Sequence, residues 1–232
     1  MRNFLKLGFA AIALIFLFNT FAVTEANAQK RPPLQEALKR MDDHNKALES
    51  LKASVRMEKY NTQIDEKDIN EGSVTYLPQK KGNPYVRIDW TKPMEESLAV
   101  ANGQYVIYRK RLNQVMKGSV EQAKGSGKAN SALAFINMSK AQLQANYTIR
   151  YVGQEDVSGS IGTWHLELTP KTKTYYKTAD IWVDKDGMPV MAKVTETNND
   201  TTTVFLSNIK KNEMINASVF TIPVPKDAKL IK

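Results

Sequence analysis

The chain contains a long series of short segments in which apolar and polar residues alternate, and this feature constrains its fold most. Alternation over about four to eight residues predicts a strand with one buried face. In residues 85–90, for example, Val86, Ile88 and Trp90 share one face. Between two such segments, Asn102-Gly103 strongly favours a tight hairpin. Strands joined in succession by short turns pair antiparallel, which argues against an alternating strand–helix fold.

About ten strands are predicted by this pattern. The Lys185-Asp186-Gly187 sequence predicts a turn, and the polar stretch 195–203 predicts a hairpin tip. Pro223 and Pro225 exclude a central strand near the C-terminus, which leaves an edge strand or an extended tail. The strands are predicted near residues 54–59, 74–76, 85–90, 97–100, 104–108, 112–117, 148–152, 163–168, 175–183, 188–196 and 201–206.

Two helices accompany the strands. Residues 34–52 place apolar side chains at spacings of three, four and seven, which is typical of one helix face. Residues 131–145 follow the flexible Gly/Ser stretch 124–128 and carry a second apolar set. Isolated helices of this kind are marginal, so each needs an apolar surface to cover. The sequence therefore predicts an α+β fold, a single large curved antiparallel sheet with helices against one face.

The first 28 residues have the pattern of an export signal. Arg2 and Lys6 precede the apolar run 7–18, and Ala26-Asn27-Ala28 provides small residues for cleavage. The run is short for a membrane span of roughly 20 residues, so an uncleaved anchor is the less favoured alternative. We expect cleavage after Ala28, a single domain over residues 29–232, and a location in the bacterial periplasm.

Composition and motifs argue against several functions. The chain has no cysteine and only two histidines, far apart, which excludes thiol chemistry and predicts no metal site. We find no glycine-rich phosphate loop, no nucleophile elbow and no catalytic carboxylate pair, so we expect no enzyme and no cofactor. The net charge of +9 is spread along the chain and no nucleic-acid motif accompanies it, so solubility is the simpler interpretation of the charge.

Several segments in order resemble the periplasmic outer-membrane lipoprotein carrier family of the LolA type. Residues 101–108 are similar to the hairpin of that family, and Leu166-Glu167-Leu168-Thr169-Pro170-Lys171 is similar to its L-x-L-x-P-K segment. The segments 181–184, 205–209 and 220–223 follow in the same order as in the family. The resemblance covers nearly the whole of residues 29–232, although each motif alone is weak.

The resemblance implies an open half β-barrel whose concave face is covered by helices and holds lipid. Leu133, Ile136 and Leu143 would belong to a lid helix. Lys81 and Arg87 are the candidates for closing the lid, since the family's Arg-Pro before this strand is replaced here. The implied cavity residues are Val74, Tyr76, Val86, Ile88, Trp90, Val106 and Tyr108.

The implied function is to take acylated lipoproteins from the inner membrane to the outer membrane. An inner-membrane lipoprotein-releasing transporter would be the donor, and an outer-membrane acceptor would receive the cargo. Two alternatives of the same fold are a lipid- or lipoprotein-sensing regulatory module and a carrier of other lipids. A secreted hydrolase is a third alternative, but no cluster of catalytic residues supports it.

Overall fold

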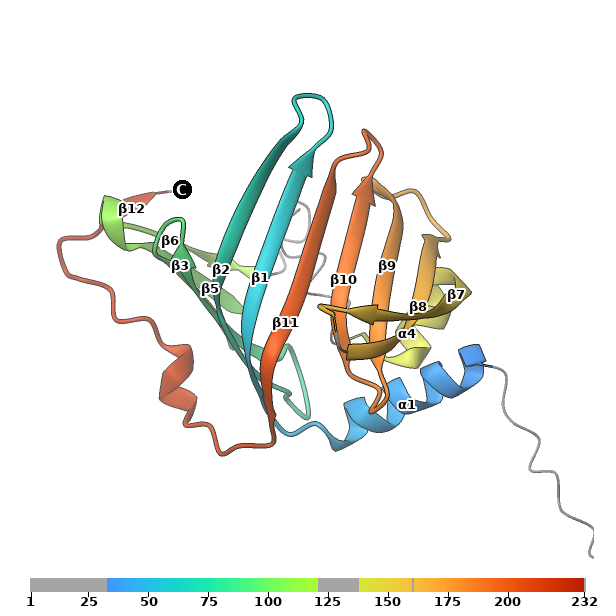
Figure 1. Cartoon of the computed structure of the whole chain (residues 1–232). Coiled ribbons are helices and arrows are strands. Elements are labelled where there is room, and N and C mark those ends of the chain that lie inside the picture. Colours follow the sequence, from blue (N-terminus) through green and yellow to red (C-terminus); the bar gives the residue numbers. More distant parts are fainter. Residues whose placement is uncertain (1–32, 121–137, 160, 232) are drawn as a thin grey trace, which may run out of the picture. The chain divides into compact units, whose positions relative to one another are not determined.

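A computed structural model describes residues 33–120, 138–159 and 161–231 of the chain. The predicted export signal at residues 1–28 lies outside this part. The described residues form one sheet of twelve strands, ordered β12-β6-β5-β4-β3-β2-β1-β11-β10-β9-β8-β7 (Figure 1). Every neighbouring pair is antiparallel except β12, which runs parallel to β6. The predicted fold class, a large curved antiparallel sheet with few helices, is confirmed.

The elements follow the chain in two groups of strands. The first group comprises α1 (Pro33–Ala47), β1 (Leu51–Asn61), β2 (Glu66–Leu77), β3 (Tyr85–Lys92), β4 (Glu96–Ala101), β5 (Gln104–Arg109), the 3-10 helix η1 (Lys110–Leu112) and β6 (Gln114–Ser119). The second comprises α4 (Lys140–Asn146), β7 (Tyr147–Val157), β8 (Ile161–Pro170), β9 (Tyr176–Asp184), β10 (Pro189–Glu196), β11 (Thr201–Lys211), the 3-10 helix η3 (Ala217–Phe220) and β12 (Lys229–Ile231).

The first helix is shorter than its apolar period predicts. It ends at Ala47, and Leu51, which the period places in the helix, is the first residue of β1. Asn212 fixes this boundary, because its side chain donates to the carbonyl of Ala47 and accepts from the backbone N–H of Glu49. Leu48 is buried in the connection after the helix, and Leu51 is buried in β1. Both residues fit the apolar period of a helix although neither lies in one. The prediction of a helix through residue 52 is wrong for this reason.

The second helix also differs from its prediction. A helix begins at Lys140, where Ser139 caps it in extended geometry and exchanges hydrogen bonds with Gln142. A continuous helix over 131–145 is therefore wrong in its boundaries, because a capping residue interrupts it. The predicted positions 131–137 lie outside the described residues.

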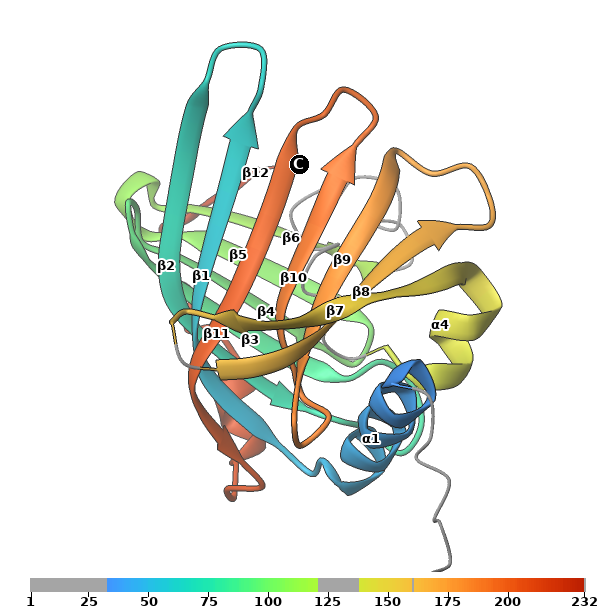
Figure 2. The same cartoon turned by 45° about the vertical axis from the view of Figure 1, so that its right-hand side comes forward.

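The main core lies on one face of the sheet, here called the inner face. Both helices pack on it, and α1 lies beside α4 at the β7 end of the sheet (Figure 2). Leu38 and Met41 from α1 and Leu143 from α4 are at most 1% exposed. They meet strand residues that are equally buried, namely Leu166, Leu168, Ile181, Ala192, Val204 and Leu206. The alternating strand pattern predicts this arrangement, since every second residue points to the core.

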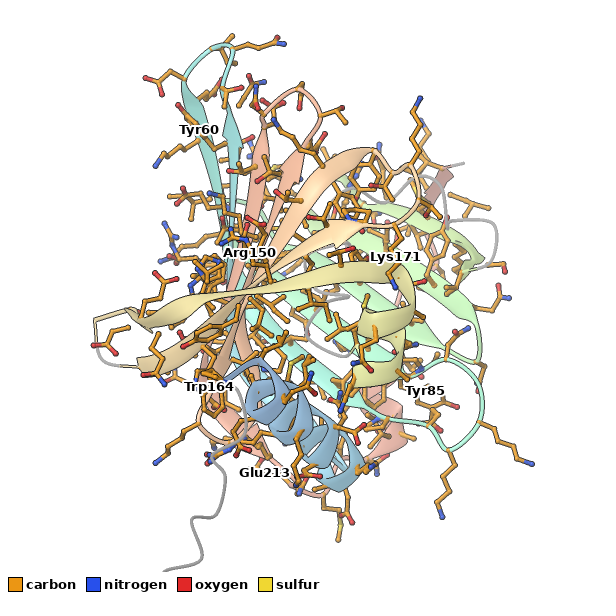
Figure 3. All side chains as sticks on the ribbon, turned by 90° about the vertical axis from the view of Figure 1, so that its right-hand side faces the viewer. Tyr60, Tyr85, Arg150, Trp164, Lys171 and Glu213 are labelled. Carbon is orange, nitrogen blue, oxygen red and sulfur yellow. The ribbon has the colours of Figure 1, made fainter. Side chains whose placement is uncertain are left out.

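The turn between β9 and β10 makes the closest approach to α1. Gly187 has a φ of +87°, and a Cβ at this position would overlap the backbone carbonyl of Arg40. The Arg40 side chain donates to the carbonyl of Lys185 at 2.5 Å, and its guanidinium lies 5.1 Å from the ring centroid of Trp164. Figure 3 shows Trp164 close to this helix. The predicted turn at residues 185–187 is confirmed, and α1 packs against it.

A second, smaller apolar cluster lies on the outer face of β3–β6. Phe220 and Ile222 from the C-terminal segment are buried there, together with Ala99 and Val115, and none of the four belongs to the main core. The ring of Phe220 meets that of Tyr85 edge to face, with centroids 5.5 Å apart. The chain then runs through its prolines to β12, an edge strand, as the sequence predicts. No helix in the part of the chain that the structure describes has the length and apolar character of a membrane span.

Candidate functional site

The inner face of β2–β6 carries an apolar surface. The two described helices cover this surface less completely than they cover the inner face of β8–β11. Directly paired residues on neighbouring strands share a face, so the register identifies its members. One row across the strands is Val74, Ile88, Leu98, Ile107 and Met116. The next row is Tyr76, Val86, Val100 and Tyr105. We call these two rows and Trp90 the apolar inner surface.

The apolar inner surface is only partly covered. Val74 and Ile88 are buried at 6% and 2% exposure, but the other members are half-buried. On β8–β10, by contrast, Leu166, Ile181 and Ala192 have no exposed area at all. Burial also raises the pKa of the Tyr76 hydroxyl above its usual value, as expected in an apolar environment. This part of the sheet therefore offers apolar area that another apolar group could cover.

Charged side chains mark one limit of the apolar inner surface. In the row beyond Leu98 and Ile107, Trp90 pairs with Glu96, and Glu96 pairs with Arg109. The Arg109 guanidinium donates to the Glu96 carboxylate at 2.7 Å. The surface is therefore apolar in its middle and charged at this margin, an arrangement suited to a ligand with an apolar body and a polar end.

Five of the seven predicted cavity residues share the inner face, and two do not. Val106 pairs with Ala99, and Tyr108 pairs with Ser97, so both point to the outer face. The Tyr108 hydroxyl donates to Asn113 in the loop before β6. The prediction that they lie on the concave face is wrong. Even-numbered residues of β4 point inward, but after the two-residue turn that follows Ala101 the odd-numbered residues of β5 do so.

The inner positions of β4–β6 were missed by the sequence reasoning. They are Leu98, Val100, Tyr105, Ile107 and Met116. A signal for them was present, because a two-residue Asn-Gly turn pairs the flanking residues Ala101 and Gln104. Counting outward from that pair places Tyr105 and Ile107 opposite Val100 and Leu98.

The predicted lid residues fall into two groups. Leu143 is fully buried in α4, whereas Leu133 and Ile136 lie outside the described residues. Lys81 is exposed in the loop before β3. Arg87 lies on the outer face and donates to the carbonyls of Val219 at 2.8 Å and Thr221 at 3.3 Å. These contacts of Arg87 hold the C-terminal segment on the outer face, opposite to the side where the helices pack.

Arg87 is supported by two groups on the same face. Its guanidinium contacts Asp89 at 2.8 and 3.0 Å, and Ser97 donates to the same carboxylate at 2.6 Å. Burial acts to raise the pKa of Asp89, but the hydrogen bonds from Arg87 and Ser97 outweigh it, so this pKa lies below its usual value. Asp89 is therefore ionised beside the Arg87 guanidinium. This ion pair holds Arg87 where it contacts the C-terminal segment.

Replacing Arg87 with methionine is expected to loosen the C-terminal segment. Hydrogen bonds from a charged group contribute about 1.5–3 kcal/mol each at most, so we expect a loss of roughly 1–3 kcal/mol in the free energy of unfolding. Limited proteolysis should then cut within residues 212–231 sooner. Arg56→Met is the matched control, since its pairing with Glu58 at 3.3 Å is exposed and contributes little. Equal effects of the two variants would contradict this role of Arg87.

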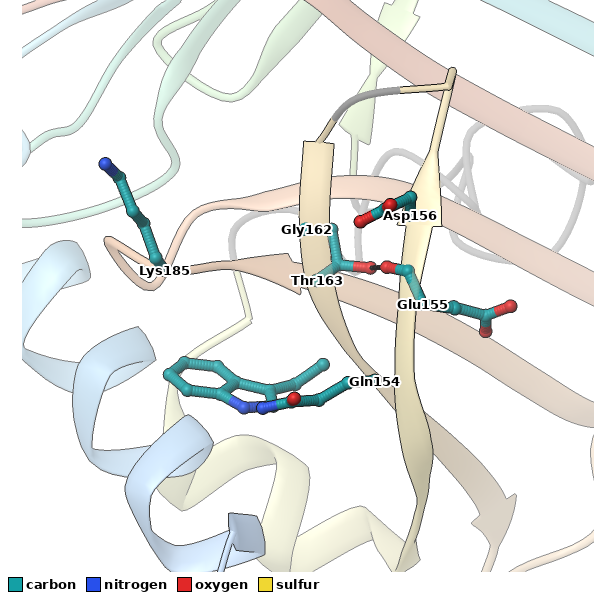
Figure 4. A pocket seen from close by; sticks show the side chains of 7 residues that line it. Gln154, Glu155, Asp156, Gly162, Thr163 and Lys185 are labelled. Atoms are coloured by element: carbon teal, nitrogen blue, oxygen red, sulfur yellow. Dashed lines mark hydrogen bonds between the residues drawn. The ribbon is translucent and has the colours of Figure 1, made fainter.

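A cavity of about 330 Å³ lies at the β7–β8 hairpin (Figure 4). Its lining combines the polar side chains of Gln154, Asp156 and Lys185 with the indole of Trp164. Charged and amide groups of this kind do not suit an acyl chain. The cavity is thus distinct in chemistry from the apolar inner surface.

His165 is half-buried on the outer face, as its strand pattern predicts. Its ring nitrogens lie 2.8 Å from Asp180 and 2.5 Å from Glu155, and it stacks on Trp182. Among the described residues, no group of three or more His, Asp or Glu side chains could hold a metal ion.

Known proteins include relatives that share part of this sequence. An outer-membrane lipoprotein carrier protein of Cupriavidus pinatubonensis is 31% identical over 144 residues, which cover 62% of this chain and 63% of that protein. A protein of the same description from Ralstonia nicotianae is 30% identical, with 62% of each chain covered. The match thus spans less than two thirds of the length of these relatives.

Two solved structures share the fold at low sequence identity. An uncharacterized conserved protein from Thermus thermophilus is similar with a TM-score of 0.54 and 15% identity, covering 86% of this chain and 99% of that one. MucB is similar with a TM-score of 0.54 and 13% identity, covering 82% and 62%. The model of the family described as outer membrane lipoprotein carrier protein LolA matches residues 62–223. With most of its length matched by that model, the chain belongs to the LolA family of outer membrane lipoprotein carrier proteins.

Proposed function

We propose that this protein carries acylated lipoproteins through the periplasm, from the inner membrane to the outer membrane. Its acyl-binding site would be the apolar inner surface of β2–β6. The observation that carries the proposal is the partial burial of that surface in a protein of the lipoprotein carrier family. The proposal includes export to the periplasm with cleavage after Ala28.

The energetics of an acyl chain explain why such a surface is needed. A chain of about 15 methylenes costs roughly 12 kcal/mol to expose to water, at about 0.8 kcal/mol per methylene. A carrier must offset most of this cost, yet it must also release the chain to an acceptor. A surface that is already half-covered gains less from binding than an open one, which keeps the affinity within a reversible range.

The helical cover over this surface would move to admit cargo. In our proposal Leu133 and Ile136 belong to this cover, and acyl chains displace it. No covalent step is required, because transfer from donor to carrier to acceptor follows from their relative affinities for the cargo. The donor would be an inner-membrane lipoprotein-releasing transporter, and the acceptor would be an outer-membrane component.

Depletion of the protein in cells tests the direction of transport. We expect lipoproteins of the outer membrane to accumulate in the inner-membrane fraction, and expression of the wild-type chain to restore their distribution. A normal lipoprotein distribution with altered membrane phospholipid would instead indicate a carrier of other lipids. A normal distribution of both, with changed gene expression, would indicate a lipid-sensing module of the same fold. Either outcome would overturn the proposal.

A further inference from the structure

The buried side of α1 carries a histidine where the helical period requires an apolar residue. Ala37 and Met41 are completely buried along this side, and Leu48 is 9% exposed at the end of the same stripe. His44 lies between Met41 and Leu48, one helical turn from each, and is 8% exposed. The contact between α1 and the rest of the protein therefore includes a titratable group that the proposed function does not use.

The surroundings of His44 favour its neutral form. Its Nε2 atom is buried and has no hydrogen-bond partner among the described residues. Burial is the largest cause of a lowered pKa, and the positive charge of Lys211 at the end of β11 lowers the pKa further. Asp184 and Asp186 at the β9–β10 turn act in the opposite direction but do not offset these effects.

The carboxylate that raises the pKa of His44 most, that of Asp184, already accepts two hydrogen bonds. Asp184 accepts hydrogen bonds from the backbone N–H groups of Asp186 and Met188, at 2.9 and 2.8 Å. On α1 itself, Lys39 pairs with Asp43, Arg40 with Glu36, and Lys46 with Asp42. An imidazolium at His44 would therefore be a buried cation beside Lys211 without a dedicated counter-ion, which is costly.

We propose that His44 makes the seating of α1 on the sheet pH-dependent: the neutral imidazole fits the buried stripe, and protonation releases the helix. Local release is cheaper than global unfolding, because it opens the contact of one helix and leaves the strands paired. Among the described residues, the polar contacts that this release would break include the bonds from Arg40 to the Lys185 carbonyl, from Asn45 to the Met138 carbonyl, and from Asn212 to the Ala47 carbonyl. This inference does not depend on the identity of the cargo.

The direction of the pH effect follows from linkage. With α1 released, His44 should titrate near the ordinary value of about 6.5, and with α1 seated it titrates below that value. The released state thus binds more protons than the packed state. The free energy that holds α1 on the sheet is therefore greatest above about pH 6.5, and it decreases as the pH falls toward the pKa of His44 in the packed state. Between the two pKa values the opening constant rises by up to about tenfold per pH unit.

Hydrogen exchange of the α1 amides, measured from about pH 8 to about pH 4.5, tests the proposal. After correction for chemical exchange rates, opening of α1 relative to β11 should rise several-fold on acidification in the wild type. His44→Met, which fills the stripe without titrating, should abolish this rise, and His44→Gln should do so with a neutral polar group. His165→Gln removes the only other histidine and should leave the rise intact.

Two outcomes would overturn the proposal. The first is an acid-induced opening of α1 that persists in both His44 variants. The second is an imidazole signal of His44, followed by NMR in the folded protein, that titrates at or above the ordinary value. If one His44 variant fails to fold, the other variant and the NMR titration of the wild type still decide the question.

Discussion

Replacing Tyr76 with glutamate is expected to weaken acyl-chain binding by more than about 100-fold. Tyr76 lies on the inner face between Leu51 of β1 and Val86 of β3. A carboxylate there must either stay in water, which disrupts the apolar inner surface, or be buried beside the acyl chain at a cost of several kcal/mol. Since about 1.4 kcal/mol corresponds to tenfold in affinity, either response removes most of the binding. Binding is measured by titration with a fluorescent acylated peptide.

Thr75→Glu is the matched control for this variant. Thr75 is the next residue on the same strand but faces outward, and its cross-strand neighbours are Lys52 and Arg87. A glutamate there gains two basic neighbours, so both folding and acyl binding should be retained. Equal loss in the two variants would mean that the apolar inner surface is not the binding site. Ile88 is less suitable for this test, because at 2% exposure a glutamate would compromise the fold itself.

Among the substitutions considered, replacing Gly187 with alanine is expected to lower the free energy of unfolding most. The residue has a φ of +87°, and a Cβ would overlap backbone atoms of Arg40 and Met41 in α1. The conformational strain alone costs about 1 kcal/mol, and displacing a helix backbone costs more than moving a side chain. We expect the free energy of unfolding to fall by about 3 kcal/mol or more, which lowers Tm by roughly 6–12 °C for a chain of this size.

Gly82→Ala separates the strain from the contact. Gly82 has a φ of +88°, but nothing lies within 4 Å of a Cβ built on it. Its replacement should therefore cost only the strain of about 1 kcal/mol. Thermal unfolding of the two variants gives the difference directly. Similar losses at both positions would show that the β9–β10 turn does not hold α1 closely.

Much of the fold could be predicted because alternation along a strand is a local signal. The strands around Ile88 and Val204, and the turn at Gly187, follow from residues adjacent in sequence. The end of α1 could not be located in this way, because it depends on Asn212, which is distant in sequence and caps the helix from the end of β11. Contacts across such separations leave no periodic pattern.

The candidate site was predictable in part for a related reason. Alternation within one strand places Val86, Ile88 and Trp90 on one face, and the register confirms that they share it. Val106 was misplaced because alternation shows which residues share a face but not which face is inward. The outer face of β3–β6 is itself apolar under the C-terminal segment, so apolar character alone did not separate the two sides.

The central claim is that this protein holds the acyl chains of a lipoprotein, and native mass spectrometry with lipid extraction tests it most directly. The protein would be purified from the periplasm alongside its Tyr76→Glu and Thr75→Glu variants. We predict a bound triacylated lipoprotein on the wild type and on Thr75→Glu, and none on Tyr76→Glu. Bound phospholipid alone would contradict lipoprotein as the cargo. A wild-type protein that is empty would contradict the account of the apolar inner surface as a binding site.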